Sequence, residues 1–189
     1  FDFIPFPDDN VGLLIADVSG KGVPASLIMA SVRAALRAQV DNVYNLSEVM
    51  RRVNLMLVRD TKPTEFVTLF YGVLDARRRR LTYCNAGHPA GLVLRDGKLI
   101  ELGSDNLVLG VNPDEVFVQN IFEFKSNDTL LLYTDGVTDV MNFEQKTFGR
   151  QRLLEAFMRI DTSAETVSQN ILWEMRRFAG LTRRSDDVT

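Results

Sequence analysis

Apolar and polar residues follow two different periods along this chain of 189 residues, and the period changes at definite points. Residues 13–16 form an uninterrupted apolar run, which is typical of a buried strand. Residues 1–6 alternate weakly and end at a turn-rich tetrad, so the two segments are predicted to pair as a hairpin. A glycine-containing turn follows, and residues 25–40 are predicted to be helical because Pro24 suits the first turn of a helix.

Helical and strand-like patterns then follow one another in blocks. Apolar residues recur at three- and four-residue steps in residues 46–57, 150–160 and 164–178, and each segment is predicted to be a helix. Segments rich in β-branched and aromatic residues predict six strands, at residues 66–75, 81–88, 90–97, 98–102, 115–124 and 128–136. Helices grouped apart from a run of antiparallel strands favour an α+β fold, with two stacked antiparallel sheets and helix pairs on the outside.

Length and composition bound the class of protein. The chain is 46% hydrophobic and 25% charged, which is ordinary for a globular protein, and residues 1–189 are predicted to form one domain. The net charge of -3 argues against nucleic acid or an anionic membrane as the partner. No apolar run approaches the roughly 20 residues that span a bilayer, so a cytoplasmic protein is expected. Cys84 is the only cysteine, which excludes an internal disulfide and suits a reducing compartment.

Two features of the sequence each allow two interpretations. Because His88 is the only histidine, a multi-histidine zinc site is excluded and a Ser-His-Asp triad is disfavoured. His88 itself is interpreted either as a general acid or as a structural histidine held between Gly87 and Pro89. Residues 77–80 are four consecutive arginines at a predicted turn, which indicate either a solvated hairpin tip or a docking patch for an acidic partner.

The segment around Asp17 combines a strand end, an acid and a tight turn. A carboxylate at the mouth of a buried strand loses hydration, and a divalent cation is one compensation. The alternative is that Asp17 only caps the turn through its own backbone. A nucleotide-binding P-loop is excluded because Lys21 is followed by Gly22, where that motif requires Ser or Thr.

Acids recur at the ends of three predicted strands. Asp135 follows an apolar run and precedes Gly136, as Asp17 precedes a glycine turn, while Asp186 and Asp187 stand where a further strand would begin. Carboxylate oxygens in a chain with one histidine predict an all-oxygen site for a hard cation such as Mg²⁺ or Mn²⁺.

Six motifs in a fixed order carry a resemblance to a known family. The segments ADVSGKGVPASLIMA, FVTLFYGVLD, YCNAGHPAGLVLR, LVLG, LLLYTDGVTDVMN with FGRQRL, and SDDVT resemble those of PPM-type metal-dependent serine/threonine phosphatases. The most similar branch is that of stage II sporulation protein E and the sigma-regulator phosphatases. The resemblance implies an αββα sandwich with two central antiparallel sheets, and hydrolysis of phosphoserine or phosphothreonine by a water that two Mn²⁺ or Mg²⁺ ions activate.

The resemblance also assigns roles to single residues. Asp17 is expected to bridge both metals with the Val18 carbonyl as a neighbouring ligand, and Asp135 and Asp186 are expected to bind the first metal. These three acids are the predicted catalytic residues, through the activated water. Asp139 is a further candidate, either as a group that supports the metal ligands from outside or as a ligand of a third cation. Asp187 is the alternative to Asp186.

The resemblance is incomplete at the chain ends, and it implies partners. Phe1 and Asp2 correspond to the last residues of a family segment whose first aspartate binds the second metal, so the domain is expected to lack its first strand segment and its last strand. The implied substrate is a phosphorylated anti-sigma-factor antagonist, and an upstream sensory or regulatory domain is expected in the full-length protein. The rival interpretation is a catalytically weak or inactive phosphoprotein-binding module of the same fold.

Overall fold

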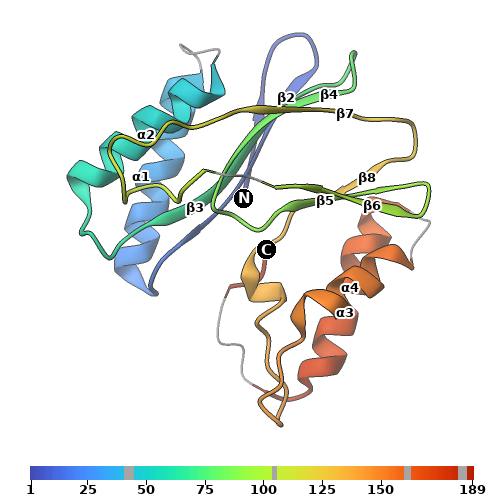
Figure 1. The fold of residues 1–189 in the computed structure, drawn as a ribbon. Helices are drawn as coiled ribbons and strands as arrows, with labels where there is room; N and C mark the ends of the chain where they lie inside the picture. The colour runs from blue at the N-terminus through green and yellow to red at the C-terminus, as the bar shows by residue number, and fades with distance from the viewer. Residues whose placement is uncertain (41–44, 104–105, 160–162, 183–186) are drawn as a thin grey trace. The chain divides into compact units, whose positions relative to one another are not determined.

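The computed structural model of this chain describes residues 1–40, 45–103, 106–159, 163–182 and 187–189. It divides into two compact units. The first contains Phe1–Ala90 and Gly103–Lys125, and the second contains Gly91–Leu102 and Ser126–Thr189. Each unit has its own sheet, its own pair of helices and its own apolar core (Figure 1).

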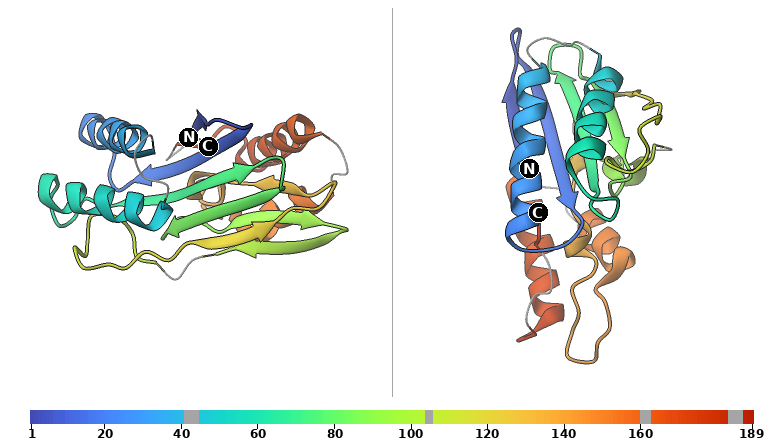
Figure 2. Two further views of the ribbon diagram at one scale, coloured as in Figure 1. Left: turned by 90° about the horizontal axis from the view of Figure 1, so that it is seen from above. Right: turned by 90° about the vertical axis from the view of Figure 1, so that its left-hand side faces the viewer.

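The first unit is a five-stranded antiparallel sheet covered by two helices. The strands follow the order β1-β2-β3-β4-β7 and are β1 (Asp2–Pro5), β2 (Asn10–Val18), β3 (Val67–Asp75), β4 (Arg80–Ala86) and β7 (Asn120–Glu123). The helices α1 (Val23–Val40) and α2 (Leu46–Asp60) lie side by side, as both views of Figure 2 show. The predicted hairpin of the first two strands is confirmed, with Phe3 opposite Leu13.

Strand alternation decides which side chains of this sheet meet the helices. Leu14, Ala16 and Val18 share one face of β2 and join the core formed with Val32 and Leu36 of α1. Further members of this core come from α2, β3 and β4, and include Met50, Val53, Leu57, Val67, Leu69, Tyr71 and Cys84. On the opposite face Phe70 and Tyr83 stack with ring centroids 5.2 Å apart, so both faces carry buried apolar side chains.

The start of α2 rests on an asparagine cap. The Asn45 side-chain oxygen accepts hydrogen bonds from the backbone N–H groups of Ser47, at 2.9 Å, and Glu48, at 3.3 Å. These donors have no partner inside the helix. We therefore expect Asn45→Ala to lower the free energy of unfolding by about 1 kcal/mol. Urea unfolding measures this difference, and Asn45→Asp, which keeps the acceptor oxygen, should retain most of the stability.

The second unit is a three-stranded antiparallel sheet packed against two helices. Its strands follow the order β6-β5-β8 and are β5 (Gly91–Arg95), β6 (Lys98–Leu102) and β8 (Thr129–Leu131). A short 3-10 helix, η1 (Asp135–Val137), precedes α3 (Gly149–Met158) and α4 (Ala164–Ala179). Apolar side chains of the two helices, among them Leu153, Phe157, Val167, Ile171 and Met175, form a core with Leu92 and Tyr133.

The predicted α+β class, with two antiparallel sheets and two helix pairs, is confirmed. The third and fourth predicted helices also form, and Ser163 caps α4 by accepting a hydrogen bond from the Thr166 N–H. Residue 160, the last of the third predicted helix, lies outside the described residues. The run of arginines lies at the β3–β4 turn, where Arg77 pairs with Asp9 at 3.2 Å and the Arg78 N–H donates to Asp75 at 2.8 Å.

Two predicted strands are wrong in extent. The strand expected at residues 115–124 is restricted to β7, because the Asn106 side chain takes the place of a neighbouring strand beside Val118. Asn106 Oδ1 accepts from the Val118 N–H at 2.7 Å, and its Nδ2 donates to the Val118 carbonyl at 3.1 Å. The strand expected at residues 128–136 ends at Leu131, which pairs with Leu92 of β5. It stops there because β5 begins at Gly91, only one residue before Leu92.

Candidate active site

Asp17 lies at the end of β2, where the long pairing with β3 holds its backbone. It is half-buried and stands opposite Thr68 in the register of the two strands. The Thr68 hydroxyl lies 3.5 Å from the Asp17 carbonyl oxygen and 2.9 Å from Nδ1 of His88. The main chain at Asp17 is thus fixed on a rigid strand, which is the condition for a side chain to act as a precise ligand.

Hydrogen bonds of Ser19 stabilise the turn after Asp17, and two glycines allow its backbone conformation. Ser19 donates its N–H to the Phe66 carbonyl at 2.9 Å, and its hydroxyl accepts the Phe66 N–H at 2.8 Å. Gly20 and Gly22 have φ angles of +90° and +78°, which L-residues with side chains resist. The chain therefore reverses from β2 into α1 within a few residues of Asp17 and Val18, as predicted.

His88 is built into the framework of the first unit. The residue is buried. Its backbone N–H donates to Asn85 Oδ1 at 2.8 Å, and its backbone carbonyl accepts from Asn85 Nδ2 at 3.0 Å. Together with the Thr68 contact at Nδ1, this fixes both its main chain and its ring. The geometry favours the structural interpretation of His88 over that of a general acid.

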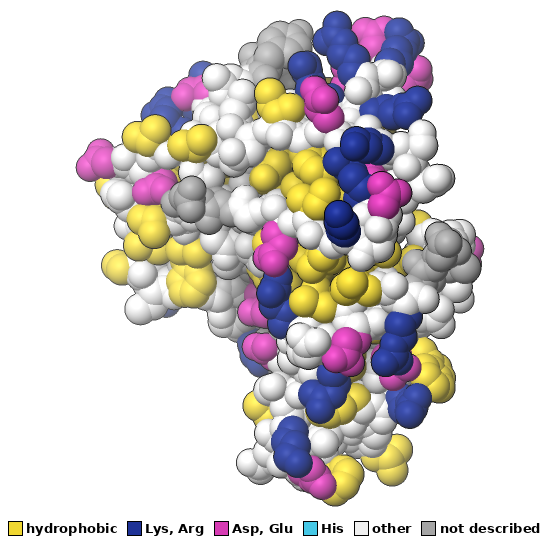
Figure 3. All heavy atoms as spheres, turned by 45° about the vertical axis from the view of Figure 1, so that its right-hand side comes forward, with side chains coloured by type: hydrophobic (Ala, Val, Ile, Leu, Met, Phe, Trp, Pro, Cys, Tyr) yellow, Lys and Arg dark blue, Asp and Glu magenta, His cyan; other side chains and the backbone are white. Residues whose placement is uncertain are grey.

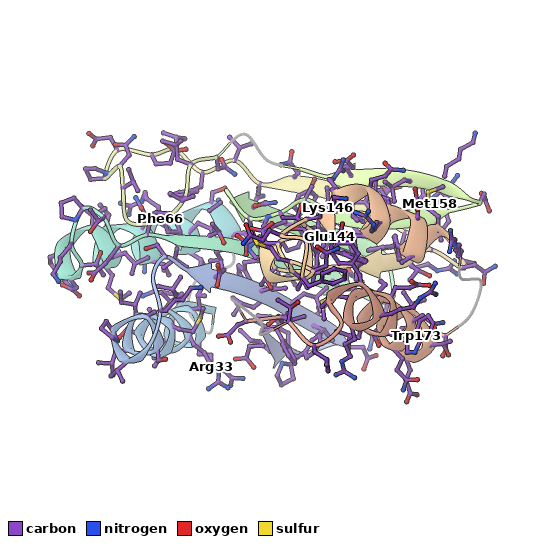
Figure 4. All side chains as sticks on the ribbon, turned by 90° about the horizontal axis from the view of Figure 1, so that it is seen from below. Arg33, Phe66, Glu144, Lys146, Met158 and Trp173 are labelled. Atoms are coloured by element: carbon purple, nitrogen blue, oxygen red, sulfur yellow. The ribbon has the colours of Figure 1, made fainter. Side chains whose placement is uncertain are left out.

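Asp135 opens η1 in the second unit. Its carbonyl oxygen accepts hydrogen bonds from the Asp139 N–H, at 2.8 Å, and the Thr138 hydroxyl, at 2.9 Å. Both carboxylates are exposed, and that of Asp139 lies 3.2 Å from the Thr138 hydroxyl. A hairpin follows, and Glu144 and Lys146 at its tip form an ion pair of 2.8 Å. Figure 4 labels these two residues. The two acids thus sit on one short, internally bonded turn.

Gly136 allows this turn to pack closely against the segment of Asp187. A side-chain methyl group at Gly136 would overlap the carbonyl oxygen of Asp187. The Thr134 hydroxyl lies 3.4 Å from the same oxygen, and Thr134 and Thr189 exchange hydrogen bonds of 3.2 Å. Asp135 is therefore fixed next to the segment that carries Asp187, within the second unit.

The structure brings together some of the predicted ligands. It places Asp135, Asp139 and Asp187 within the second unit and Asp17 and Val18 in the first, while Asp186 lies outside the described residues. In the part of the chain that the structure describes, no three His, Cys, Asp or Glu side chains gather in a metal-binding group. The available donors are carboxylate and carbonyl oxygens, a set that suits a hard divalent cation and no soft one.

Asp2 has a different environment from these acids. Its carboxylate accepts hydrogen bonds from Arg33 Nε, at 2.8 Å, and from Arg37 Nε and Nη2, at 2.7 and 2.9 Å. The hydrogen bond to Arg37, and then that to Arg33, lowers the pKa of Asp2 far below its usual value. Asp2 therefore fastens β1 to α1, which agrees with its exclusion from the predicted ligand set.

Sequence reasoning missed the residues that hold these turns in place. Thr68, Thr134 and Thr138 fix the main chain around the acids, yet threonine is common in strands and turns. A usable signal was the pattern TDGVT, which places hydroxyl groups directly before and three residues after Asp135. Asn54 had no signal, although its buried side chain accepts the Gly110 N–H at 2.8 Å and fixes the LVLG segment.

Comparison with known proteins identifies similar chains. The family model described as stage II sporulation protein E (SpoIIE) matches residues 7–189. The phosphoserine phosphatase RsbU of Bacillus subtilis (strain 168) is 29% identical over 177 residues, which cover 90% of this chain and 52% of RsbU. The chain thus spans about half the length of this curated relative.

Solved structures share the fold. The crystal structure of the RsbU and RsbW domains of a Mycobacterium tuberculosis protein has a TM-score of 0.83 and 25% identity, covering 100% of this chain and 52% of that one. The catalytic domain of the serine/threonine protein phosphatase PstP, in complex with two manganese ions, has a TM-score of 0.67 and 19% identity, covering 99% and 87%. None of the helices in the described part of the chain could span a bilayer.

Proposed function

Because the chain belongs to the stage II sporulation protein E family, we propose that it is the catalytic domain of a phosphoprotein phosphatase acting on phosphoserine or phosphothreonine. The observation that carries the proposal is that the family match extends over residues 7–189 and so includes all the acid-bearing turns. The relative RsbU, itself a phosphoserine phosphatase, supports the same reaction.

We propose that Mn²⁺ or Mg²⁺ is the cofactor, with two ions in the complete domain. The proposed ligands are Asp17, the Val18 carbonyl, Asp135 and Asp186, with Asp139 and Asp187 as additional oxygen donors. The oxygen-only donor set supports this choice, as do the two manganese ions in the structure of PstP. When bound, divalent cations lower the pKa of water and neutralise charge on the phosphoryl oxygens.

Residues around the proposed ligands hold the main chain of Asp17 and Asp135 in place. β3 holds Asp17 at the end of β2, and the hydroxyl of Thr138 holds the main chain of Asp135. Covalent catalysis by the single thiol is disfavoured, because Cys84 is fully buried and burial raises its pKa to about 12. We therefore propose that water attacks the phosphoryl group directly, without a thiol intermediate.

The substrate and setting are proposed from the relatives. We propose a phosphorylated anti-sigma-factor antagonist as the substrate, since RsbU represents the branch that the sequence motifs resemble. A sensory or regulatory segment outside this chain would supply the input signal. A reducing, cytoplasmic setting suits a phosphoprotein regulator with one buried thiol and no second cysteine.

Removal of divalent metal should abolish turnover. The intact protein, treated with EDTA and desalted, should release no phosphate from a phosphoserine peptide, and Mn²⁺ or Mg²⁺ should restore the rate. Restoration should saturate with metal, and Ca²⁺, which prefers more ligands and longer distances, should restore less. Full turnover in metal-free buffer would contradict the proposed chemistry. Binding of the phosphopeptide without turnover under every metal condition would support the rival, a phosphoprotein-binding module.

A further inference from the structure

A groove runs between α3 and α4 in the second unit and contains none of the proposed metal ligands. It encloses about 280 Å³, close to the lower end of the volumes of small-ligand pockets. Phe148 and Ala156 are buried beneath it, and Phe178 is half-buried at one side. A space of this size accommodates one or two side chains of a bound segment.

Charged side chains line the groove above this apolar floor. They are Arg152, Arg159 and Arg177, with Glu155 and Glu174. The arginines outnumber the glutamates here, although the chain as a whole has a net charge of -3. Figure 3 shows one face of the molecule, on which basic and acidic side chains are interspersed over the part that contains these helices. With three arginines against two glutamates, the lining of the groove carries one net positive charge.

These charges are little used by the protein itself. Arg177 approaches Glu174, on the same helix, only to 3.8 Å, and Glu155 accepts a hydrogen bond from Gln151 at 3.1 Å. No ion pair joins α3 to α4 among the residues that the structure describes. Exposed pairs such as that of Arg177 contribute little to stability. The guanidinium groups of Arg159 and Arg177 are therefore available to an outside carboxylate.

Arg152 is held in place beside an aromatic surface. Its Nη1 donates to the carbonyls of Thr147, at 3.2 Å, and Phe148, at 2.9 Å. Its guanidinium carbon lies 4.6 Å from the centre of the Phe178 ring, which packs edge-on against Phe148 at 5.6 Å. A fixed cation beside a fixed ring reduces the entropy lost when a ligand binds.

We propose that this groove docks an acidic peptide segment of a partner protein, in which carboxylates flank an apolar side chain. The carboxylates would pair with Arg159 and Arg177, and the apolar side chain would lie against the half-buried Phe178 ring. Glu155 and Glu174 would reject basic segments. The proposal is independent of the phosphatase chemistry, since no residue of the groove belongs to the proposed metal site.

The test uses the intact protein and a fluorescein-labelled pentapeptide with two glutamates around a central phenylalanine. Fluorescence anisotropy should show saturable binding that weakens as salt is raised. Peptides with glutamine or lysine in place of glutamate should bind at least tenfold more weakly. Trp173, the only tryptophan, lies with its ring centre 5.2 Å from the Arg177 guanidinium carbon, so its emission gives a second signal. Figure 4 labels Trp173 at the outer surface of α4.

Matched variants locate the binding site. Arg159→Gln with Arg177→Gln should weaken peptide binding at least tenfold, while Arg176→Gln, an exposed neighbour outside the groove, should leave it unchanged. Turnover of a small phosphate ester should be the same in all variants, which shows that they are folded.

Several outcomes would overturn the proposal. One is equal weakening by Arg176→Gln, and another is equal binding of the glutamine peptide. Absence of saturable binding up to millimolar peptide would do the same. Competition by inorganic phosphate or free glutamate as effective as that by the unlabelled peptide would replace peptide docking with a small-anion site.

Discussion

Asp135→Asn should reduce phosphatase turnover at least 100-fold and leave the fold intact. Losses among the outer groups that merely support metal ligands cost 10- to 100-fold in metal affinity or activity, and a direct ligand should cost no less. Asparagine keeps the size of the side chain. The hydrogen bonds from Thr138 and Asp139 go to the main-chain carbonyl of residue 135, so they survive the substitution.

Stability separates a ligand from a structural acid. Asp135 is exposed, and its substitution removes one of the two negative charges that it and Asp139 place on the same turn, so the melting temperature of the metal-free protein should stay the same or rise. Stabilisation by added Mn²⁺ should be weakened in the variant, because a ligand that binds only the folded state shifts its melting temperature. Asp96→Asn, in the exposed β5–β6 turn, is the matched control and should change neither turnover nor the effect of Mn²⁺. A melting temperature lower by many degrees in metal-free buffer would make Asp135 a structural acid.

The elements with strong local signals were predicted from the sequence. The helices follow from apolar residues at three- and four-residue steps, and the start of α1 follows from the Gly22 and Pro24 turn. The ends of the strands were less predictable, because they depend on neighbours far away in the sequence. Val118 leaves the sheet because an asparagine side chain, twelve residues earlier, satisfies its backbone.

The candidate site shows the same limit. The positions of Asp17 and Asp135 at glycine turns could be predicted, since an apolar run that ends in an acid and a glycine is a local pattern. The threonine that fixes Asp17, Thr68, lies 51 residues away, and Thr134 meets the chain end 55 residues later. Such pairs arise from strand register and chain topology, which local patterns do not encode.

Gly136→Ala should damage both stability and turnover, although it adds only one methyl group. The added carbon would overlap the Asp187 carbonyl oxygen and lie 2.9 Å from the carbonyl carbon, both of which belong to the backbone and cannot rotate away. Either the segment of Asp187 moves, which breaks the hydrogen bonds between Thr134 and Thr189, or η1 moves and carries Asp135 with it.

Overpacking of this kind costs about 1–3 kcal/mol. For a chain of this size, each kcal/mol corresponds to about 2–4 °C in melting temperature. Gly103→Ala is the matched control, because a methyl group there meets no atom of the described residues within 4 Å, and it should behave like the wild type. Calorimetry and turnover of a phosphopeptide measure the two effects. If Gly136→Ala matched Gly103→Ala in both, Asp187 would not be held against η1, and its place beside Asp135 in the proposed ligand set would be lost.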